Sequence, residues 1–227
     1  MSQQPHGAES SHQHVADQPG EVAGAGEETL TARQLGGKDA LALADLAAIF
    51  DDLQFVLGCC ERLLGELARG EQQDTVVVEA LWIAALSTYA RCFRSRESGA
   101  ALSPTDLSAT ALKGEVAKWH ELLGKLRDFA VDGVANTREE FFVGASRTST
   151  GAPAGIVVTS ISRPRVDEAT VRQTGRLAFE LSSVVDGRVK ERTQKVFSLA
   201  RRLSTTDFDK LDPIEIDWSP ATSSESS

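Results

Sequence analysis

One repeating pattern of apolar residues constrains the fold of this chain more than any other feature. Between residues 43 and 67 apolar residues recur in strictly alternating steps of three and four: Leu43, Leu46, Phe50, Leu53, Leu57, Cys60, Leu64 and Leu67. This is the a/d pattern of a helix that packs against another helix. Four further apolar residues widen the seam into a core-facing stripe: Ala42, Ile49, Val56 and Leu63. The pattern predicts a long helix in a bundle or at a dimer seam, and the extra width favours the bundle.

Capping residues predict where the first two helices begin. Asp39 precedes the periodic stretch and is the expected N-cap of the first helix. Asp74 is the expected N-cap of a second helix, from Thr75 to about Arg96. Apolar residues cover nearly the whole circumference of this second helix, so we expect other helices to surround it.

The second half of the chain predicts two more helices with a hairpin between them. Ser103-Pro104-Thr105-Asp106 is a capping box that starts a helix, which pauses near Gly114 and runs on to about Val131. Asp132-Gly133 then breaks the helix. Two strand-like runs, at about residues 140–162, predict a β-hairpin. A last long helix follows from Asp167 to Leu203, although Asp186-Gly187 within it is compatible with a turn.

These elements predict a mainly α fold, an up-and-down helical bundle with a small β-hairpin inserted before the last long helix. We expect a disordered N-terminal tail over residues 1–37, the bundle domain over residues 38–211 and an acidic C-terminal tail over residues 212–227. In that tail, Ile214, Ile216 and Trp218 alternate as a strand would.

Charge, cysteine content and hydropathy narrow the possible functions. The formal net charge of -9 argues against broad, nonspecific nucleic-acid binding. The acidic residues gather at the ends, so residues between them are close to neutral and leave room for a local basic site. An odd number of cysteines, three, argues against a disulfide framework and suits a reducing cytoplasm. No apolar run reaches the ~18 residues of a membrane span, so we expect no membrane partner.

Few residues carry recognisable chemistry. The sequence has no phosphate-cradling glycine loop, metal-ligand cluster or nucleophile elbow, so we expect no metal and no cofactor. Arg91, Arg94 and Arg96 lie together at the end of the second helix. They either complement the negative end of the helix dipole or form a small anion-binding patch. His120 and Arg127, seven residues apart, lie on one face of the next helix.

Three short motifs resemble those of HEPN-type domains, which are compact helical bundles. Tyr89-Ala90-Arg91-Cys92-Phe93 is similar to the YARPF of bacterial relatives, and His120 followed by Leu126-Arg127-Asp128 is similar to their H-x-x-L-x-x-L-R-D. Asn136 and Glu139 also fit downstream. The resemblance covers about residues 40–205. It implies that Arg91, His120, Arg127, Asp128 and Asn136 are the candidate binding residues.

The resemblance also identifies a missing residue. In catalytic HEPN-type proteins an arginine and a histidine a few residues later form a metal-independent ribonuclease site, usually across a dimer. In this chain the position of that histidine is Gly133. Glycine can neither accept nor donate the proton of a 2′-OH group, and loss of a general base typically costs about 10²–10⁴ in rate. The catalytic assignment therefore fails at its central residue.

Two functions remain open at this stage. The favoured one is a non-catalytic domain that binds another protein or its own copy. The alternative is a divergent RNA-acting ribonuclease, of the toxin or defence type, or a nucleotide-binding protein that uses Arg91, His120 and Arg127. If those three side chains meet in one cleft, the alternative function is favoured. If Arg127 is held by aspartates or backbone carbonyls, the non-catalytic function gains.

Overall fold

The computed structural model describes residues 31–133 and 135–215 of the chain. The chain divides into two compact parts, each described by itself below. The larger part spans Leu35–Arg202 and holds the long helices and the hairpin. Of the described residues, the smaller part combines residues 31–34 with residues 203–215.

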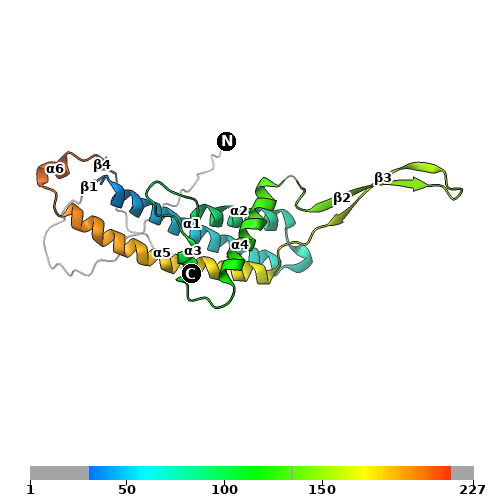
Figure 1. The fold of residues 1–227 in the computed structure, drawn as a ribbon, viewed down its shortest axis with the longest axis horizontal. Helices are drawn as coiled ribbons and strands as arrows, with labels where there is room; N and C mark the ends of the chain where they lie inside the picture. Colours follow the sequence, from blue (N-terminus) through cyan, green and yellow to red (C-terminus); the bar gives the residue numbers. More distant parts are fainter. Residues whose placement is uncertain (1–30, 134, 216–227) are drawn as a thin grey trace, which may run out of the picture. The chain divides into compact units, whose positions relative to one another are not determined.

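The long helix α1 (Lys38–Leu67) is the centre of the larger part. It packs along one side against α2 (Thr75–Cys92) and along another against α5 (Glu168–Ala200), as Figure 1 shows. The shorter helix α4 (Val116–Arg127) packs mainly against α2. This arrangement confirms the mainly α fold with a small hairpin before the last long helix.

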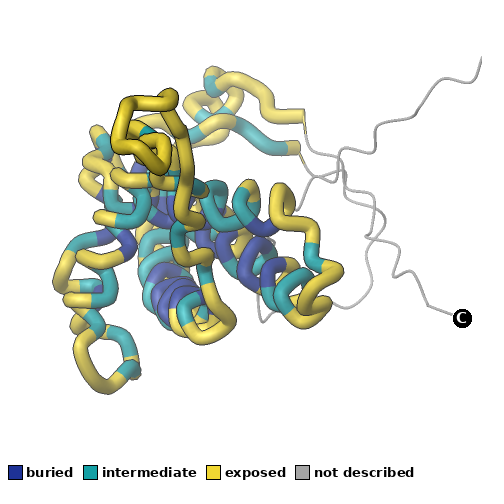
Figure 2. Tube along the Cα trace, turned by 90° about the vertical axis from the view of Figure 1, so that its right-hand side faces the viewer, coloured by how far each residue is buried: buried dark blue, intermediate teal, exposed yellow. Residues whose placement is uncertain are grey.

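The wide apolar stripe of α1 is used inside the bundle. Its most enclosed side chains are Ile49, Leu53, Val56 and Leu63, none of which has any exposed surface. Three of these four are the positions that widened the predicted seam. The flanking seam residues Phe50, Leu57, Leu64 and Leu67 are partly buried against the same core. Figure 2 shows the buried residues gathered along the packed helices. A helix between two partners needs a broad stripe, because it buries two faces at once.

The first helix does not begin as its sequence predicts. Gly37, at φ 93°, is the N-cap, and the helix starts at Lys38. Asp39 therefore lies inside the first turn, where its carboxylate accepts hydrogen bonds from Arg192 and, at 2.8 Å, from Lys195 of α5. The two cations lower the pKa of Asp39, the Lys195 hydrogen bond most. Asp39 is thus a tie between α1 and α5 instead of a cap.

The second helix begins as predicted but is only partly enclosed. The Asp74 side chain accepts hydrogen bonds from the backbone N–H groups of Val76 and Val77, which confirms it as the N-cap. The same two valines are 72% and 38% exposed, so the expectation that helices surround α2 is wrong. The exposed residues of α2 lie in its first two turns and at Arg91, whereas every residue from Leu81 to Ala90 is buried or half-buried.

Helix α2 also bears on whether the chain contains a helix that could span a membrane. Among the described residues it is the one helix long and apolar enough to cross a membrane, with a mean hydropathy of 1.2 over 18 residues. No run of this length and hydropathy is expected from the sequence, so α2 corrects that expectation. A single helix of this kind is weak evidence for a span, because the core helix of a soluble protein meets the same criteria. Here Ala85, Leu86 and Tyr89 are buried within the bundle.

The helix predicted from Ser103 to Val131 is in fact two α-helices and a short π-helix. The capping box at Ser103 is confirmed: the Asp106 carboxylate accepts hydrogen bonds from the Ser103 backbone N–H and hydroxyl, both at 2.8 Å. The helix it starts, α3 (Pro104–Ser108), has only five residues. The chain then bends through Gly114, at φ 101°, before α4 begins. A five-residue π-helix, η2 (Asp128–Asp132), continues α4 and ends at Gly133 as expected.

The hairpin consists of β2 (Glu139–Arg147) and β3 (Pro153–Ser162), in antiparallel register with Val143 opposite Val158. A bulge lies between Ser146 and Arg147. Both strands are exposed along almost their whole length, and Figure 1 shows them extending beyond the helices of the same part. The hairpin thus contributes almost nothing to the helical core.

Helix α5 and the smaller part complete the fold. Asp167 caps α5 by accepting from the Thr170 N–H at 2.8 Å. The helix continues through Asp186-Gly187, so no hairpin turn forms there, and it ends at Ala200, before the predicted Leu203. In the smaller part, β1 (Ala32–Arg33) pairs antiparallel with β4 (Pro213–Ile214), next to α6 (Thr205–Asp209). These strands lie within the two predicted tails, of which residues 1–30 and 216–227 are outside the described residues.

A partly buried ion-pair network joins the end of α2 to α1. Asp52 of α1 is only 8% exposed and accepts two hydrogen bonds from Arg91, at 2.9 and 2.5 Å. Two turns earlier, Asp45 accepts from Arg96 at 3.1 Å and from the Ser98 hydroxyl at 2.5 Å. Two carboxylates on one face of α1 therefore hold the chain where it leaves α2.

We expect Asp52→Ala to lower the free energy of unfolding by about 1–2 kcal/mol, because hydrogen bonds to charged groups are lost at a mostly buried position. The matched control is Asp51→Ala, at the exposed neighbouring residue, which should change it by no more than about 0.5 kcal/mol. Urea unfolding followed by circular dichroism measures both. Equal effects of the two substitutions would contradict a specific role for the Asp52 pair.

Candidate functional site

The five candidate residues lie on different elements and have different partners. Arg91 is in the last turn of α2, His120 and Arg127 are in α4, Asp128 opens η2, and Asn136 precedes β2. Arg91 is engaged by Asp52, and that hydrogen bond raises the pKa of the guanidinium further. Neither helix-dipole complementation nor an anion patch is needed to explain this arginine, since it forms an ion pair with α1.

His120 packs against two aromatic residues of α2. Its Nδ1 lies 2.9 Å from the Tyr89 hydroxyl, and its ring centroid is 4.4 Å from that of Phe93. Tyr89 is 2% exposed, so this hydrogen bond satisfies a hydroxyl group that is buried. Burial lowers the pKa of His120, an effect that the negative charge of Glu121 partly opposes. The Tyr89–Phe93 motif and the His120 motif therefore meet as one packing contact between α2 and α4.

Arg127 is held by two carboxylates of the π-helix. Its NH2 group lies 2.6 Å from Asp128 Oδ1, and its NH1 group lies 2.7 Å from Asp132 Oδ2. The local charge of this cluster is -1, because one guanidinium faces two carboxylates. A phosphate approaching Arg127 would meet both carboxylates, which opposes the binding of an anion. The candidate pair Arg127-Asp128 is thus an ion pair within one turn of the chain.

Asn136 organises the entry to the hairpin. Its Oδ1 accepts hydrogen bonds from the N–H groups of Arg138, at 2.8 Å, and Glu139, at 3.0 Å. This Asx turn starts β2. The adjacent Thr137 hydroxyl and Arg138 guanidinium both contact Glu79 of α2, at 2.6 and 3.2 Å. The hydrogen bond from Thr137 is the main cause of a lowered pKa at Glu79. Asn136 therefore belongs to the anchor of the hairpin.

Gly133 occupies the position where a ribonuclease of the resembled type needs histidine. Its φ is -73°, which any residue can adopt, so backbone conformation does not require glycine here. Glycine is required here because the position has no room for a Cβ atom. A Cβ at this position would overlap the carbonyl oxygen of Phe129 and lie 3.1 Å from its carbonyl carbon. The tight path of the π-helix therefore excludes any side chain at residue 133.

The geometry does not gather a catalytic set. Arg91, His120 and Arg127 each contact a separate group of residues, and Arg127 is held by aspartates. Within residues 31–133 and 135–215, no group of three or more His, Cys, Asp and Glu side chains is placed to hold a metal ion. The candidate residues are thus structural contacts of α1, α2, α4 and the hairpin base.

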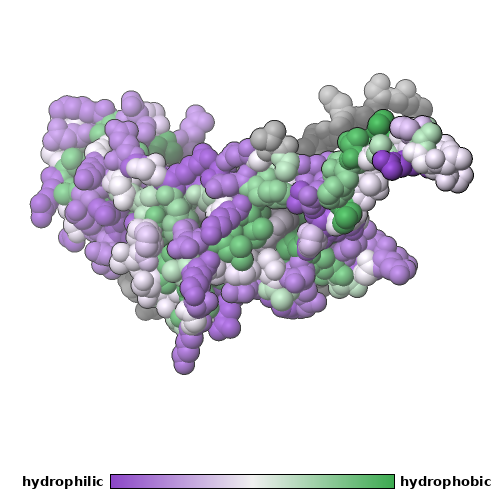
Figure 3. Space-filling view, turned by 45° about the vertical axis from the view of Figure 1, so that its right-hand side comes forward, coloured by the Kyte–Doolittle hydropathy of each residue, from purple (hydrophilic) through white to green (hydrophobic). Residues whose placement is uncertain are grey.

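The apolar surface of the hairpin was missed by the sequence analysis. Residues opposite one another share a face, and alternate residues share it along each strand. One face carries Phe141, Val143, Ile156 and Val158, which are 60% to 73% exposed. We call these four residues the Phe141 face. The signal in the sequence was the unbroken runs FFV and IVV, which place apolar side chains on both faces of a strand. Figure 3 shows apolar residues at the surface of this projection.

Comparisons with protein-family models, with curated proteins and with solved structures find no match.

The environment of His120 predicts a pH dependence of stability. The folded state disfavours the charged imidazole, whereas the unfolded chain takes up the proton near the ordinary pKa of about 6.5. The stability contributed by the neutral ring is therefore complete above that pH and is lost as the pH falls through the lowered folded pKa. His120→Gln should remove this loss, seen as a smaller decline of unfolding free energy between neutral and mildly acidic pH. Parallel curves for variant and wild type would contradict it.

Two glycine substitutions test the steric role of residue 133. Gly133→Ala should lower the free energy of unfolding by about 1–3 kcal/mol, because the methyl group collides with the Phe129 backbone. Gly124→Ala is the matched control within α4. Nothing lies within 4 Å of a Cβ there, and alanine favours a helix over glycine by about 1 kcal/mol. Denaturant unfolding should therefore give opposite signs for the two variants, and a neutral or stabilising Gly133→Ala would refute the steric explanation.

Proposed function

We propose that this chain is a non-catalytic interaction protein, a degenerate HEPN-type domain that associates with a second copy through the Phe141 face of its hairpin. The observation that carries this proposal is the exposure of four large apolar side chains on one face of an isolated hairpin. Two-stranded hairpins are marginally stable in water unless a further surface packs on them. An exposed apolar surface of this kind is typical of an interaction site.

The distribution of charge favours a second copy as the occupant. Phe141–Ser146 of β2 and Pro153–Ser162 of β3 contain no charged residue. In a two-fold pair each residue meets its own copy or a symmetry-related neighbour, so charged strands would repel one another. The whole chain carries a net charge of -9, which disfavours self-association over most of its surface. The neutral hairpin is where two copies can meet without that repulsion.

The contacts of the candidate residues argue against catalysis. His120 is paired with Tyr89, Arg127 is paired with Asp128 and Asp132, and Gly133 has no room for a side chain. The alternative, an RNA-acting protein that uses Arg91, His120 and Arg127, would require all three to exchange these partners. A non-catalytic role requires no change in the partners of Arg91, His120 and Arg127.

The cysteines support a cytoplasmic location within this proposal. Cys59, Cys60 and Cys92 are free and buried. Burial raises the pKa of Cys60 and that of Cys92 to about 12, so both thiols stay protonated at neutral pH. Three free cysteines with no disulfide among the described residues are the pattern typical of a reducing compartment.

Self-association is tested by paired substitutions on adjacent residues of β3. Val158→Glu places a charge on the Phe141 face and should weaken dimerisation by tenfold or more, since about 1.4 kcal/mol corresponds to tenfold. Thr159→Glu adds the same charge on the opposite face and should leave dimerisation nearly unchanged. Light scattering and sedimentation at micromolar concentrations measure both. A wild-type monomer at high concentration, or equal loss in both variants, would reject the proposal.

A second experiment addresses catalysis. The purified wild-type chain should cleave no RNA in the presence of a metal chelator, because residue 133 offers no proton acceptor and two carboxylates flank Arg127. Gly133→His should not create activity, since the side chain cannot enter without moving the Phe129 backbone. Robust cleavage by the wild-type chain, abolished by Arg127→Ala or His120→Ala, would overturn the non-catalytic assignment.

A further inference from the structure

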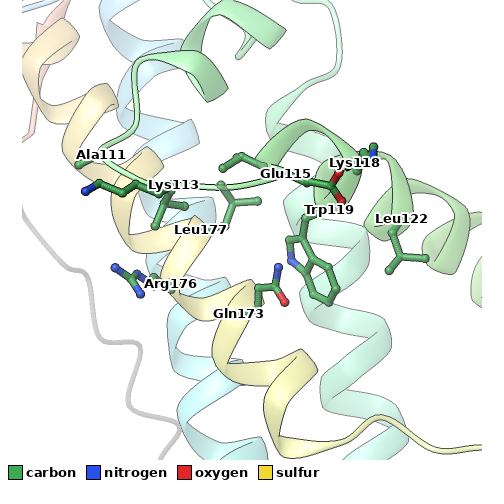
Figure 4. Close-up of a pocket in the computed structure, with 11 residues that line it drawn as sticks. Ala111, Lys113, Glu115, Lys118, Trp119, Leu122, Gln173, Arg176 and Leu177 are labelled. Atoms are coloured by element: carbon green, nitrogen blue, oxygen red, sulfur yellow. Dashed lines mark hydrogen bonds and ion pairs between the residues drawn. The ribbon is translucent and has the colours of Figure 1, made fainter.

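A separate cavity lies between the loop that precedes α4 and the N-terminal half of α5. Its volume is about 700 Å³. The loop over residues 109–115 passes across α5, and the turn at Gly114 leads the chain into α4. Figure 4 shows side chains from the loop, α4 and α5 surrounding the same space. The hairpin and the candidate residues discussed above do not line it.

The walls of the cavity are apolar on one side and basic on the other. Leu112, Val116, Trp119, Leu122 and Leu177 provide the apolar lining. Lys113, Lys118 and Arg176 provide three positive charges, and Glu115 provides one negative charge, which gives a local net charge of +2. This is a concentration of positive charge in a chain whose net charge is -9.

Two of these cations are free to meet a ligand. Lys118 forms an ion pair with Glu115, so the two charges offset one another. Lys113 and Arg176 have no ion pair or side-chain hydrogen bond within the described part of the chain. Lys113 extends from the loop and Arg176 extends from α5, as Figure 4 shows. Two unpaired cations from separate elements favour an anionic group between them.

Trp119 supplies an apolar wall and an unsatisfied donor. Its Nε1–H is enclosed and has no hydrogen-bond acceptor within the described residues. An unpaired buried donor of this kind costs about 1–3 kcal/mol. Figure 4 shows the indole ring facing Gln173 across the edge of the cavity. The first turn of α4 adds further hydrogen-bond donors at the cavity. Its backbone N–H groups receive no capping hydrogen bond from the side chain of the N-cap residue, Glu115.

We infer that this cavity binds a small molecule that joins a planar apolar body to one anionic group, a phosphate or a carboxylate. The planar body lies against Trp119, Leu122 and Leu177. The anionic group lies between Lys113 and Arg176, near the positive end of α4. Small-molecule sites usually combine a mostly apolar lining with a few polar groups. This site is independent of self-association through the Phe141 face.

The test follows the indole N–H signal of Trp119 in the ¹H–¹⁵N spectrum of the full chain, assigned with Trp119→Phe. The probes are phenyl phosphate, benzoate, inorganic phosphate and phenol. Phenyl phosphate, benzoate or both should shift the signal saturably, and whichever of the two binds identifies the anionic group. Inorganic phosphate and phenol should each bind at least about tenfold more weakly, since each lacks one half of the ligand.

Two arginine variants of α5 locate the anion. Arg176→Gln should weaken binding of the active probe by about fivefold, the effect of losing one partly exposed charge pair. Arg172→Gln, one turn earlier and already paired with Glu168 at 2.6 Å, is the matched control and should bind as the wild type does. Lys113→Gln provides a second cavity variant in case Arg176→Gln perturbs the fold. Failure of both aryl anions to shift the Trp119 signal would overturn the inference. So would equal binding by all three variants, or binding of phosphate or phenol alone as tightly as the aryl anion.

Discussion

The whole bundle depends on the burial of two faces of α1. A helix of 30 residues with a stripe broad enough for two partners must find both, or leave leucine and isoleucine side chains in water. Helices α2 and α5 are those partners, and α4 reaches the core by packing mainly on α2. Polar contacts then fix the alignment at several levels of α1: Asp39 with α5, Asp45 with the segment after α2, and Asp52 with α2 itself. Three aspartates on a mostly apolar helix thus specify how its neighbours are placed along it.

Local signals in the sequence were sufficient for most helix starts and insufficient for helix lengths. Asp74 and Ser103 were identified correctly, because a cap depends on residues two or three positions away. Asp39 was assigned wrongly, since its carboxylate is taken by cations more than 150 positions away. The apolar circumference of α2 suggested complete enclosure, but composition does not record how many neighbours the rest of the chain provides. The helix at Ser103 is shorter than predicted, because α3 already ends at Ser108 and a loop through Gly114 separates it from α4.

The partners of the candidate site residues also depend on contacts between positions far apart in the sequence. The sequence placed Arg91, His120 and Arg127 in suggestive motifs, and their types were compatible with phosphate chemistry. Their partners decide otherwise: Asp52 lies 39 positions from Arg91, and Tyr89 lies 31 positions from His120. Only the pairing of Arg127 with Asp128 and Asp132 was within local range. The hairpin surface and the Trp119 cavity escaped notice because exposure depends on what packs nearby, and a sequence pattern alone does not state it.

The geometry at Gly133 also bears on how this chain could change over generations. A π-turn that brings the Phe129 carbonyl against residue 133 makes the glycine and the turn mutually dependent. A single codon change to histidine would enter a backbone that cannot accommodate it. A side chain at residue 133 would first need the segment over residues 128–132 to adopt ordinary α-helical winding. The residue and the backbone before it can therefore change only together, and single substitutions of this glycine meet a steric barrier.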